Sequence, residues 1–476
     1  MAFDTFAFIM FFAATTAIYF CLVAKWQNRF LLFSSYVFYG YLNPWFCTLL
    51  FASTLLDYVC ANKIQAHKNA GDQANLARNY LVLSLISNFG VLIGFKALGV
   101  SSEISSAIYS LLGLSGSSLA LEIAVPVGLS FYTFQTAGYV IDVYRQEVEA
   151  EGDFFDFALF VSLYPQLISG PIEKAKKLLP QIRRSRRVSF SDVNHATWLI
   201  VLGLFKKVAV ADNLYFYVKD FVFNFYSYNS TAALLGIYIC IIYAYADFSG
   251  YCHIARGVGK LLGFELSINF RSPLLSKNPA DFWRRWHITL VVWSKKNIFL
   301  PLYKTLSPTL GRRTSFTLAA ATSLTTFGLW HGFKPNFLAF GIYHAVLLIG
   351  YFAINPASIN VFRHLAYVAG VWRTASHFVF FHLLAYSSVF FFVEQKHLWT
   401  AIIKRVFTMD FGPASNADAF VFFGFPIIVL EVLFPNGADD FLGYPKIARL
   451  AIASCCLLFI LLCGASQRQE FIYFQF

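Results

Sequence analysis

The sequence predicts an all-α, multi-pass membrane protein whose residues 1–476 form a single membrane-embedded domain. Hydrophobic residues make up 58% of the chain and charged residues only 13%, about half the usual ~25%. The apolar residues also form long unbroken runs, which favour helices over the strict alternation of a β-barrel. At about 20 apolar residues per span, the chain accommodates roughly 11–13 transmembrane helices. This composition excludes a disordered chain and an ordinary soluble enzyme.

The net charge of +12 bears on how the chain crosses the membrane, since Lys and Arg stay on the cytoplasmic side. Lys25 and Arg29 follow the first apolar run, which predicts an N-terminus outside the cytoplasm. That run, residues 3–23, has no basic residue before it, so we expect a retained span rather than a cleaved signal peptide. The next spans are expected at about 30–50, at a run ending near 61 and at 80–98, followed by an external connection at 100–118.

Two segments do not fit simple spans. Residues 157–171 are apolar but short and contain Pro165, Gly170 and Pro171, which predicts a re-entrant segment buried in protein. Residues 270–313 carry nine basic residues and one acid between large apolar ones, which predicts interfacial and re-entrant cytoplasmic helices. The remaining spans are expected near residues 126–143, 196–218, 231–253, 315–331, 335–354, 365–393, 418–434 and 447–464.

Histidine is the residue type with which this chain can do chemistry. The eight cysteines lie in or beside apolar runs without a metal-type spacing, so neither a disulfide framework nor a zinc site is expected. The chain also lacks a nucleophile elbow, a phosphate-binding Walker loop and a zincin motif. General-base catalysis by an imidazole remains available, without a tightly bound cofactor or a metal.

The first histidine of interest, His287, follows a predicted helix start. Asn278 is a favoured N-cap and Pro279 a favoured first helical residue. Helical spacing then puts Trp283 beside His287 on one face of an interfacial helix. Alternatively, this helix is an interfacial anchor, and His287 is incidental. The side chains that the helix offers to a substrate are Trp283, Trp286, Arg284 and Arg285.

The second histidine, His331, lies between Trp330 and Gly332 at the end of an apolar run. If this run is helical from Arg313, His331 lies about 27 Å along the helix, well inside or across the membrane core. An ionisable residue at that depth is a functional candidate. The alternative is a C-terminal helix cap, because Gly332 suits the C′ position and a histidine near a helix end is favoured by the helix dipole.

Other polar groups in apolar surroundings leave further interpretations open. Asp247, His253 and Glu431, together with the two histidines, would suit a proton-coupled transporter. The same groups could instead form buried packing pairs, such as Lys207 with Asp212. A non-catalytic scaffold for polysaccharide secretion is the third interpretation.

Several stretches together resemble the membrane-bound O-acyltransferase (MBOAT) family. The likeness is strongest to its bacterial alginate O-acetyltransferase branch and more distant to the D-alanyl transfer proteins of teichoic acid modification. It covers about residues 120–345, the motif-bearing core, and the helices at about 365–476 favour the alginate type. The matching stretches are residues 164–172, 203–208 with 211–213, 247–251, 281–287 and 329–332 with 343–344. The chain departs from the branch at Cys252 and His253 and at residues 389–393.

The resemblance implies a ring of transmembrane helices around a central tunnel. It maps His331 onto the catalytic histidine of the family and His287 onto the second motif histidine. It implies transfer of an acetyl group, carried by acetyl-CoA, from the cytoplasmic side to an external acceptor for exopolysaccharide O-acetylation. A carrier-protein donor, as in D-alanylation, is the alternative. We assign Trp330 and Asp247 to substrate binding with the four residues at 283–286. Arg284, Arg285, Lys295 and Lys296 are expected to meet the donor phosphates.

The resemblance also implies where the protein works and with what. We expect the inner membrane of a bacterium, an acyl donor on the cytoplasmic side, and a partner O-acetyltransferase with polysaccharide machinery on the outer side. No nucleic-acid partner is expected, because the positive charge already has a topological explanation.

Overall fold

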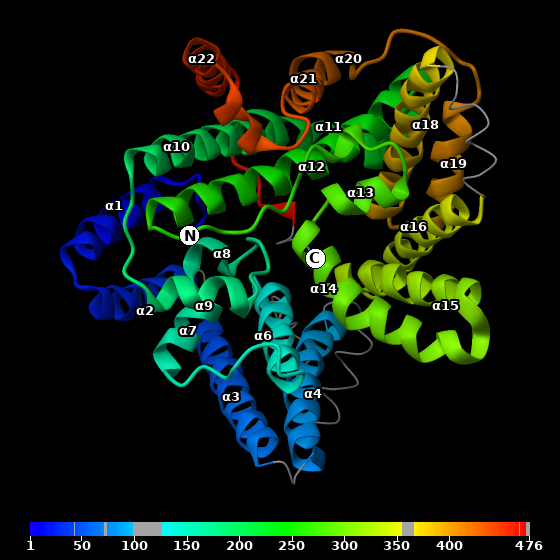
Figure 1. Ribbon diagram of the computed structural model, residues 1–476. Coiled ribbons are helices and arrows are strands. Elements are labelled where there is room, and N and C mark those ends of the chain that lie inside the picture. Colours follow the sequence, from blue (N-terminus) through cyan, green and yellow to red (C-terminus); the bar gives the residue numbers. More distant parts are fainter. Residues whose placement is uncertain (42, 71–73, 99–125, 355–365, 466, 473–476) are drawn as a thin grey trace, which may run out of the picture. The chain divides into compact units, whose positions relative to one another are not determined.

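The computed structural model describes residues 1–41, 43–70, 74–98, 126–354, 366–465 and 467–472, and this part of the chain is helical without strands (Figure 1). The predicted all-α class is confirmed. Within these ranges, six helices are long and apolar enough to cross a membrane, and Phe6–Cys21 is a shorter apolar helix. The predicted ring, its tunnel and the full number of spans stay predictions. The six helices contain the spans Pro44–Asn69, Ala74–Ala97, Ser230–Leu261, Pro335–Ala353, Thr374–Phe392 and Lys446–Cys463.

The chain divides into two compact units. The first unit comprises Met1–Ile200 and Tyr251–Ser267, and the second comprises Val201–Gly250 and Ile268–Phe476. The described helices that begin in the first unit are α1 (Phe6–Cys21), α2 (Ala24–Gly40), α3 (Pro44–Asn69), α4 (Ala74–Leu98), α6 (Leu129–Tyr144), α7 (Phe154–Ser162), α8 (Tyr164–Leu167), α9 (Ala175–Arg183) and α10 (Phe190–Leu204).

The second predicted span, at 30–50, is wrong in its boundaries. Helix α2 ends at Gly40, and α3 begins at Pro44 after Asn43, whose side chain accepts a hydrogen bond from the Trp45 amide at 3.0 Å. An Asn–Pro pair starts a helix and does not continue one, because proline lacks the amide that the preceding turn needs. Helix α3 also runs to Asn69 and not only to residue 61. The predicted connection at 100–118 lies outside the described residues.

The short, broken structure expected at 157–171 is present. The chain forms α7, turns at Leu163, and forms the single turn α8 with Pro165 near its start. Most of this segment is buried. Whether it is re-entrant in a membrane stays a prediction.

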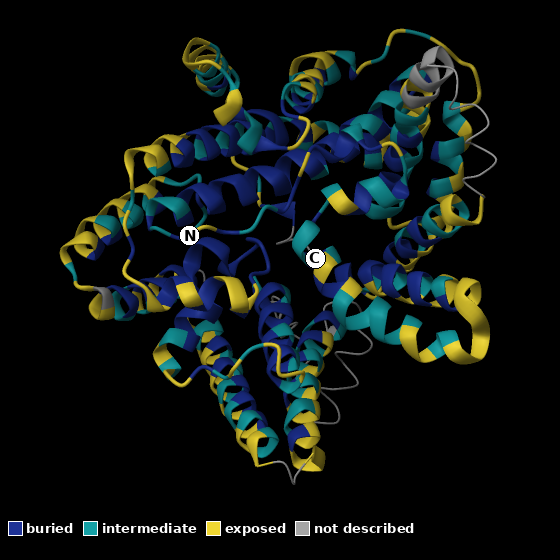
Figure 2. Ribbon diagram, viewed as in Figure 1, coloured by how far each residue is buried: buried dark blue, intermediate teal, exposed yellow. Residues whose placement is uncertain are grey.

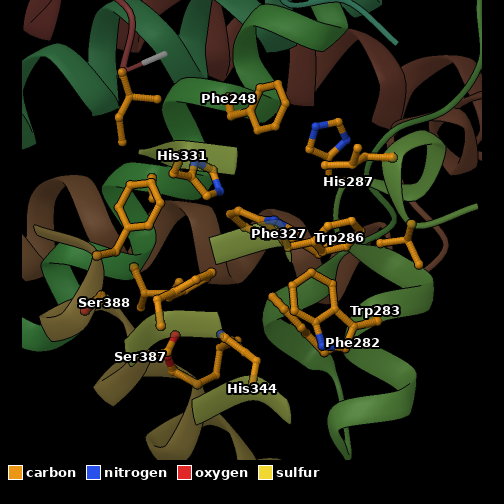
Figure 3. Close-up of a pocket in the computed structure, with 18 of the residues that line it drawn as sticks. Phe248, Phe282, Trp283, Trp286, His287, Phe327, His331, His344, Ser387 and Ser388 are labelled. Carbon is orange, nitrogen blue, oxygen red and sulfur yellow. The ribbon is translucent and has the colours of Figure 1, made fainter. Parts of the chain in front are cut away.

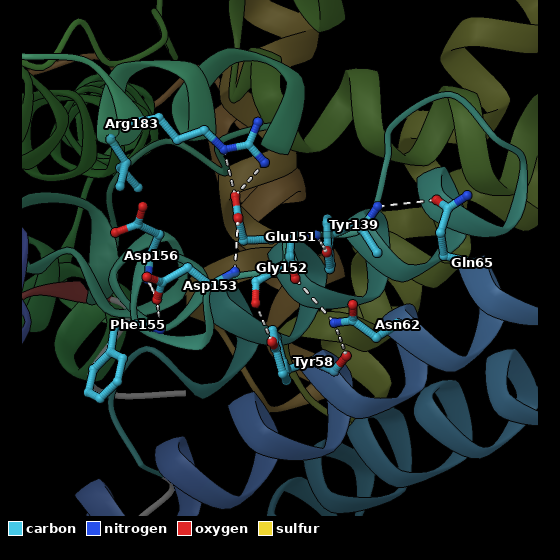
Figure 4. Close-up of polar contacts among 12 residues, drawn as sticks. Tyr58, Asn62, Gln65, Tyr139, Glu151, Gly152, Asp153, Phe155, Asp156 and Arg183 are labelled. Atoms are coloured by element: carbon cyan, nitrogen blue, oxygen red, sulfur yellow. Dashed lines mark hydrogen bonds and ion pairs between the residues drawn. The ribbon is translucent and has the colours of Figure 1, made fainter.

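A polar network holds the acidic loop before α7 in place (Figure 4). The Tyr58 hydroxyl donates to the Gly152 carbonyl at 2.6 Å, and the Asn62 amide donates to the Glu151 carbonyl at 3.1 Å. The Glu151 carboxylate pairs with Arg183 at 2.6 Å. These contacts tie α3, this loop and α9 together, so the basic residue Arg183 has a structural partner.

The second unit contains the two candidate histidines, His287 and His331. Its long helix α15 (Leu300–His331) bends at Gly311, where the backbone has φ 75° and ψ 164°, and the two arms fold back on each other (Figure 1). Only glycine adopts such a backbone without strain. The described helices that begin in this unit are η1 (Phe205–Ala211), α11 (Asp212–Asn224), η2 (Phe225–Ser227), α12 (Ser230–Leu261), η3 (Pro273–Leu275), α13 (Pro279–Arg285), α14 (Ile288–Ser294), η4 (Lys295–Phe299), α15, α16 (Pro335–Ala353), α18 (Ala366–Phe392), α19 (Lys396–Val406), α20 (Ala417–Ala419), η5 (Phe420–Gly424), α21 (Phe425–Leu433), η6 (Ala438–Gly443) and α22 (Lys446–Cys463).

Two helices show the extremes of burial (Figure 2). In the apolar window of α12, 72% of the residues are buried, whereas in that of α22 only 6% are. An apolar helix as exposed as α22 is stable in contact with lipid, since lipid tails are as apolar as its side chains. This agrees with a protein embedded in a membrane.

Candidate active site

A narrow, largely apolar cavity of about 50 Å³ lies inside the second unit (Figure 3). By the same measure a single water needs about 10–15 Å³, so the cavity has room for a few waters or a group of similar size. Both predicted histidines line it, and a third, His344, does as well. Its described lining consists of Ile241, Ala244, Phe248, Phe282, Trp283, Trp286, His287, Leu290, Val291, Phe327, Trp330, His331, Phe340, His344, Leu384, Ser387, Ser388, Phe391, Phe392 and Ile472.

The crossing of α15 and α16 brings two of the histidines to the cavity. A side-chain carbon at Gly328 of α15 would lie 2.1 Å from the Phe337 carbonyl oxygen, and one at Gly341 of α16 would lie 2.7 Å from the Leu324 carbonyl oxygen. Any larger residue at either position would therefore push the helices apart. The two glycines allow the close packing that sets His331 and His344 around one space.

His331 is the last residue of α15 and is 9% exposed. Its ring lies 4.6 Å from the Trp330 ring and 4.9 Å from the Phe391 ring, centroid to centroid. Gly332 has φ 167° and ψ 160°, which is extended backbone. Helix α15 therefore ends at His331 with Gly332 as its C-cap, as the helix-cap alternative expected, and the chain continues in an extended conformation towards α16.

His287 lies between two short helices. The predicted helix start is confirmed, since the Asn278 side chain accepts a hydrogen bond from the Asp281 amide at 2.8 Å. The predicted helical face shared by Trp283 and His287 is wrong: α13 ends at Arg285, and His287 has the left-handed φ of 42° as the N-cap of α14. Because the helix ends between Trp283 and His287, the two residues do not share a helical face. Both side chains nevertheless line the cavity.

Asn269 orients the His287 ring. The His287 Nδ1 atom lies 3.2 Å from the Asn269 Oδ1 atom, which also accepts hydrogen bonds from the amide and the hydroxyl of Thr289. The backbone supports this contact, since the Ile288 amide donates to the Asn269 carbonyl at 3.0 Å. An acceptor oxygen at Nδ1 assigns the ring proton to Nδ1, so Nε2 is the basic nitrogen.

Burial keeps His287 uncharged. The residue lies outside the six candidate spans, and its 2% exposure lowers its pKa from the ordinary 6.5 to about 3, because a charged ring would lose its hydration. The Phe248 ring contacts it edge-on at 4.8 Å. A neutral imidazole is the form that can accept a proton.

His344 is the functional candidate that sequence reasoning did not include among the site residues. It is 1% exposed, stacks on Phe282 at 5.7 Å, and meets the Trp283 ring edge at 5.1 Å. Within the described part of the chain, neither of its ring nitrogens has a hydrogen-bond partner. A buried polar group in that state costs about 1–3 kcal/mol, so a partner entering the cavity would stabilise it. The sequence signal that could have identified His344 was its place in residues 343–344, one of the stretches that resemble the family.

Two serines of α18 were also missed. Ser387 and Ser388 line the cavity (Figure 3), and their hydroxyls donate to the carbonyls of Leu384 and Ala385 in their own helix at 2.6 and 2.7 Å. They come from the stretch next to residues 389–393, where the sequence departs from the resembled branch. No residue pattern in α18 distinguishes them from ordinary helix serines.

The predicted aromatic residues line the cavity, whereas the charged ones do not, and the substrate roles of both sets stay predictions. Trp283, Trp286 and Trp330 belong to the lining. Arg284 is 72% exposed at its side chain, 3.6 Å from Asp281. The charged residues assigned to substrate and donor that lie outside the described lining are Arg284, Arg285, Lys295, Lys296 and Asp247.

Arg285 and Asp247 are engaged with the chain itself. Arg285 donates to the Arg271 and Pro435 carbonyls at 3.1 and 2.9 Å. Asp247 is fully buried and accepts hydrogen bonds from the Lys207 ammonium at 2.8 Å and from a backbone amide. The predicted pair of Lys207 and Asp212 is confirmed at 2.7 Å. The substrate roles assigned to Arg284, Arg285 and Asp247 stay predictions.

The arrangement provides neutral imidazoles in an apolar, aromatic-walled space. Among the residues that the structure describes, no group of three His, Cys, Asp or Glu side chains could hold a metal ion. Proton transfer and nucleophilic attack by imidazole are the chemistry that these side chains support.

Comparisons with known proteins bear on this chemistry. The family model described as MBOAT, membrane-bound O-acyltransferase family, matches residues 31–393. A probable alginate O-acetylase AlgI of Pseudomonas syringae pv. tomato is 31% identical over 368 residues, covering 76% of this chain and 69% of that protein. A peptidoglycan O-acetyltransferase of Helicobacter pylori is 30% identical over 378 residues, covering 71% of this chain and 68% of that protein. A teichoic acid D-alanyltransferase of Bacillus subtilis is 25% identical, covering 47% and 58%.

Proposed function

This chain belongs to the membrane-bound O-acyltransferase family, and on that premise we propose that it moves an acetyl group from a cytoplasmic thioester to a hydroxyl on the outer side, for O-acetylation of an exopolysaccharide. The observation that carries the proposal is the meeting of His331, His287 and His344 in one apolar cavity of about 50 Å³. A cavity of that size suits a small acyl group.

His331 acts on the acceptor in this proposal. One ring nitrogen takes the proton of the acceptor hydroxyl while the oxygen forms a bond to the acyl carbon. The carbon–sulfur bond breaks, and the imidazolium returns the proton to the departing thiolate. General-base action of this kind is typically worth about 10²–10⁴-fold in rate. Alternatively, His331 itself holds the acyl group for a short time between donor and acceptor.

His287 and the aromatic walls support the step. The contact with Asn269 holds the His287 ring in one orientation, and Nε2 is its basic nitrogen. Trp283, Trp286 and Trp330 exclude water from the acyl group and so limit hydrolysis of the thioester. Holding the two reactants in one narrow space also raises the rate through positioning.

In this proposal the donor is acetyl-CoA, which binds at a basic cytoplasmic surface. Arg284 is exposed, and Lys295 is exposed on η4, so both are available to the phosphates of a soluble donor. An acylated carrier protein is the alternative donor. Carrier proteins are acidic, and the same cations would bind them.

The names of two relatives support the proposed acceptor. Two of them are named as O-acetylases of alginate and of peptidoglycan, both of them polysaccharides. We propose an inner-membrane location in a bacterium, with the N-terminus outside the cytoplasm because Lys25 and Arg29 follow the first span. An O-acetyltransferase on the outer side would take over the acetyl group and modify the polysaccharide.

The experiment that tests the donor uses the purified protein in proteoliposomes. Acetyl-CoA labelled in the acetyl group is added on one side, and release of free CoA and label on an oligosaccharide acceptor are measured. We expect both with acetyl-CoA. Release only with an acetylated carrier protein would establish the alternative donor, and no release with either would contradict acyl transfer.

A further inference from the structure

The chain enters the interior of the second unit at residues 471 and 472, after the exposed Glu470. Phe471 and Ile472 are 3% and 2% exposed, although the neighbouring helix α22 is mostly exposed. Two hydrogen bonds connect the C-terminal end of α22 and the residues after it to α11 and η1. The Cys463 carbonyl accepts from the Asn213 side chain at 2.8 Å, and the Ala465 amide donates to the Val208 carbonyl at 3.1 Å.

Asp247 holds this segment by its backbone. One carboxylate oxygen of Asp247 accepts from the Ile472 amide at 2.7 Å, and the other accepts from Lys207 at 2.8 Å. The Lys207 ammonium also donates to the Gln469 carbonyl at 3.1 Å. Hydrogen bonds to charged groups are about twice as strong as neutral ones, and the two that Asp247 accepts are buried, so the segment is held firmly.

The two apolar side chains of the segment have different surroundings. The Phe471 ring packs against the Phe248 ring at 5.9 Å and is not among the described cavity-lining residues. Ile472 is among them, with His287 and His331. One branched aliphatic side chain, fixed at its own amide by a buried carboxylate, thus forms part of the cavity wall.

We propose that Ile472 determines which acyl group the cavity accepts, by occupying the space that a longer chain would need. The proposal rests on the acyl-transfer function proposed above and extends it to specificity. A cavity of about 50 Å³ leaves little room beyond a two-carbon acyl group, and the branched side chain of Ile472 forms part of its wall. Asp247 is then a positioning residue, which acts through the backbone of Ile472.

The magnitude follows from pocket selectivity in general. One methylene group in a hydrophobic pocket changes selectivity by about 10–200-fold. Shortening Ile472 to alanine removes three carbons from the wall, enough for one extra methylene of the acyl chain. We therefore expect the ratio of propionyl to acetyl transfer to rise at least about tenfold.

The test compares acetyl-CoA with propionyl-CoA as donors for the parent protein, Ile472→Ala and Phe471→Ala in proteoliposomes. Phe471→Ala is the matched control, because it shortens the adjacent, equally buried side chain that does not line the cavity. We expect the propionyl to acetyl ratio to rise in Ile472→Ala and to stay at the parent value in Phe471→Ala. An equal rise in both variants would overturn the proposal.

Two further outcomes keep the proposal distinct from the function on which it rests. Parent protein that transfers acetyl groups, with an unchanged ratio in Ile472→Ala, would overturn the specificity role alone. Parent protein that transfers neither group would overturn both. If Ile472→Ala does not insert into the membrane, Ile472→Val replaces it with a smaller expected rise, and an unchanged ratio in that variant would overturn the proposal.

Discussion

The His287 Nδ1 atom lies 3.2 Å from the Asn269 Oδ1 atom, and this contact assigns the basic nitrogen of the ring to Nε2. It exists because residues 269–271 and 285–288 run past each other, with the Arg271 amide on the Arg285 carbonyl at 2.9 Å and the Ile288 amide on the Asn269 carbonyl at 3.0 Å. An asparagine 18 residues upstream thus orients a histidine of the cavity.

Replacing Asn269 with alanine should lower acyl transfer by about fivefold, because a hydrogen bond that orients the ring is worth about 1 kcal/mol. The measurement is the transfer rate at saturating donor. Asn416→Ala is the matched control, since Asn416 is equally buried but donates to the Ala232 carbonyl at 3.0 Å. Equal losses in the two variants would show that Asn269 only supports the fold.

His287 should make the protein sensitive to acid. Its pKa is about 3 in the folded protein, whereas in the unfolded chain it has the ordinary value of 6.5. Between these values the unfolded state binds the extra proton, so the stability that His287 provides is complete above about pH 6.5 and is lost as the pH falls. The slope approaches about 1.4 kcal/mol per pH unit.

Thermal unfolding of the purified protein between pH 7 and pH 4 measures this slope. The variant His287→Gln cannot take up the proton, so its Tm should fall less over the same range than that of the parent. Identical Tm profiles would mean that the ring is hydrated in the folded protein.

Replacing His344 with phenylalanine should separate stability from function. The ring stacks on Phe282, and its nitrogens have no hydrogen-bond partner within the described residues, so an aromatic ring without polar atoms should fit at equal or higher Tm. Acyl transfer should nevertheless fall at least about tenfold, because the cavity loses a polar group. A Tm several degrees lower, or transfer at the parent rate, would show that His344 contributes to packing only.

Arg284 and Arg285 should behave differently although they are neighbours. Arg284→Ala removes an exposed cation and should raise the donor KM by up to about fivefold at low salt, with an unchanged Tm, and the difference should shrink at high salt. Arg285→Ala should lower the Tm, because Arg285 donates to the carbonyls of Arg271 and Pro435.

Steady-state kinetics in proteoliposomes give the KM values, and Lys446→Ala serves as a control that removes an exposed cation outside the predicted docking set. If Arg284→Ala and Lys446→Ala raise the KM equally, the donor is attracted by overall charge and does not dock at Arg284.

Local signals in the sequence predicted the elements that local chemistry determines. Asn278 and Pro279 start α13 as expected, and the proline and glycine breakers at 165–171 coincide with the short helices α7 and α8. His287, His331 and the three tryptophans, which the sequence singled out, line one cavity, and their catalytic and substrate roles stay predictions. Composition together with the long unbroken apolar runs was sufficient for the helical membrane class.

The contacts that cross the chain were not predictable in this way. Helical spacing placed Trp283 next to His287, but the left-handed backbone of His287 depends on its pairing with Asn269, which no local pattern indicates. His344 gained its place through the glycine contacts of α15 and α16. The backbone amide of Ile472 is held beside the cavity by the carboxylate of Asp247, which lies 225 residues upstream. In each case, tertiary packing decided the outcome.

His331→Ala, assayed for acyl transfer in proteoliposomes, tests the proposed chemistry of the cavity. We expect normal membrane insertion and a transfer rate lower by at least about 10²-fold, the low end of the effect of a general base. His397→Ala, which removes an exposed imidazole on α19, should retain the parent rate. A His331→Ala protein that transfers acetyl groups within a few-fold of the parent rate would contradict the assignment of His331 as the base or acyl acceptor.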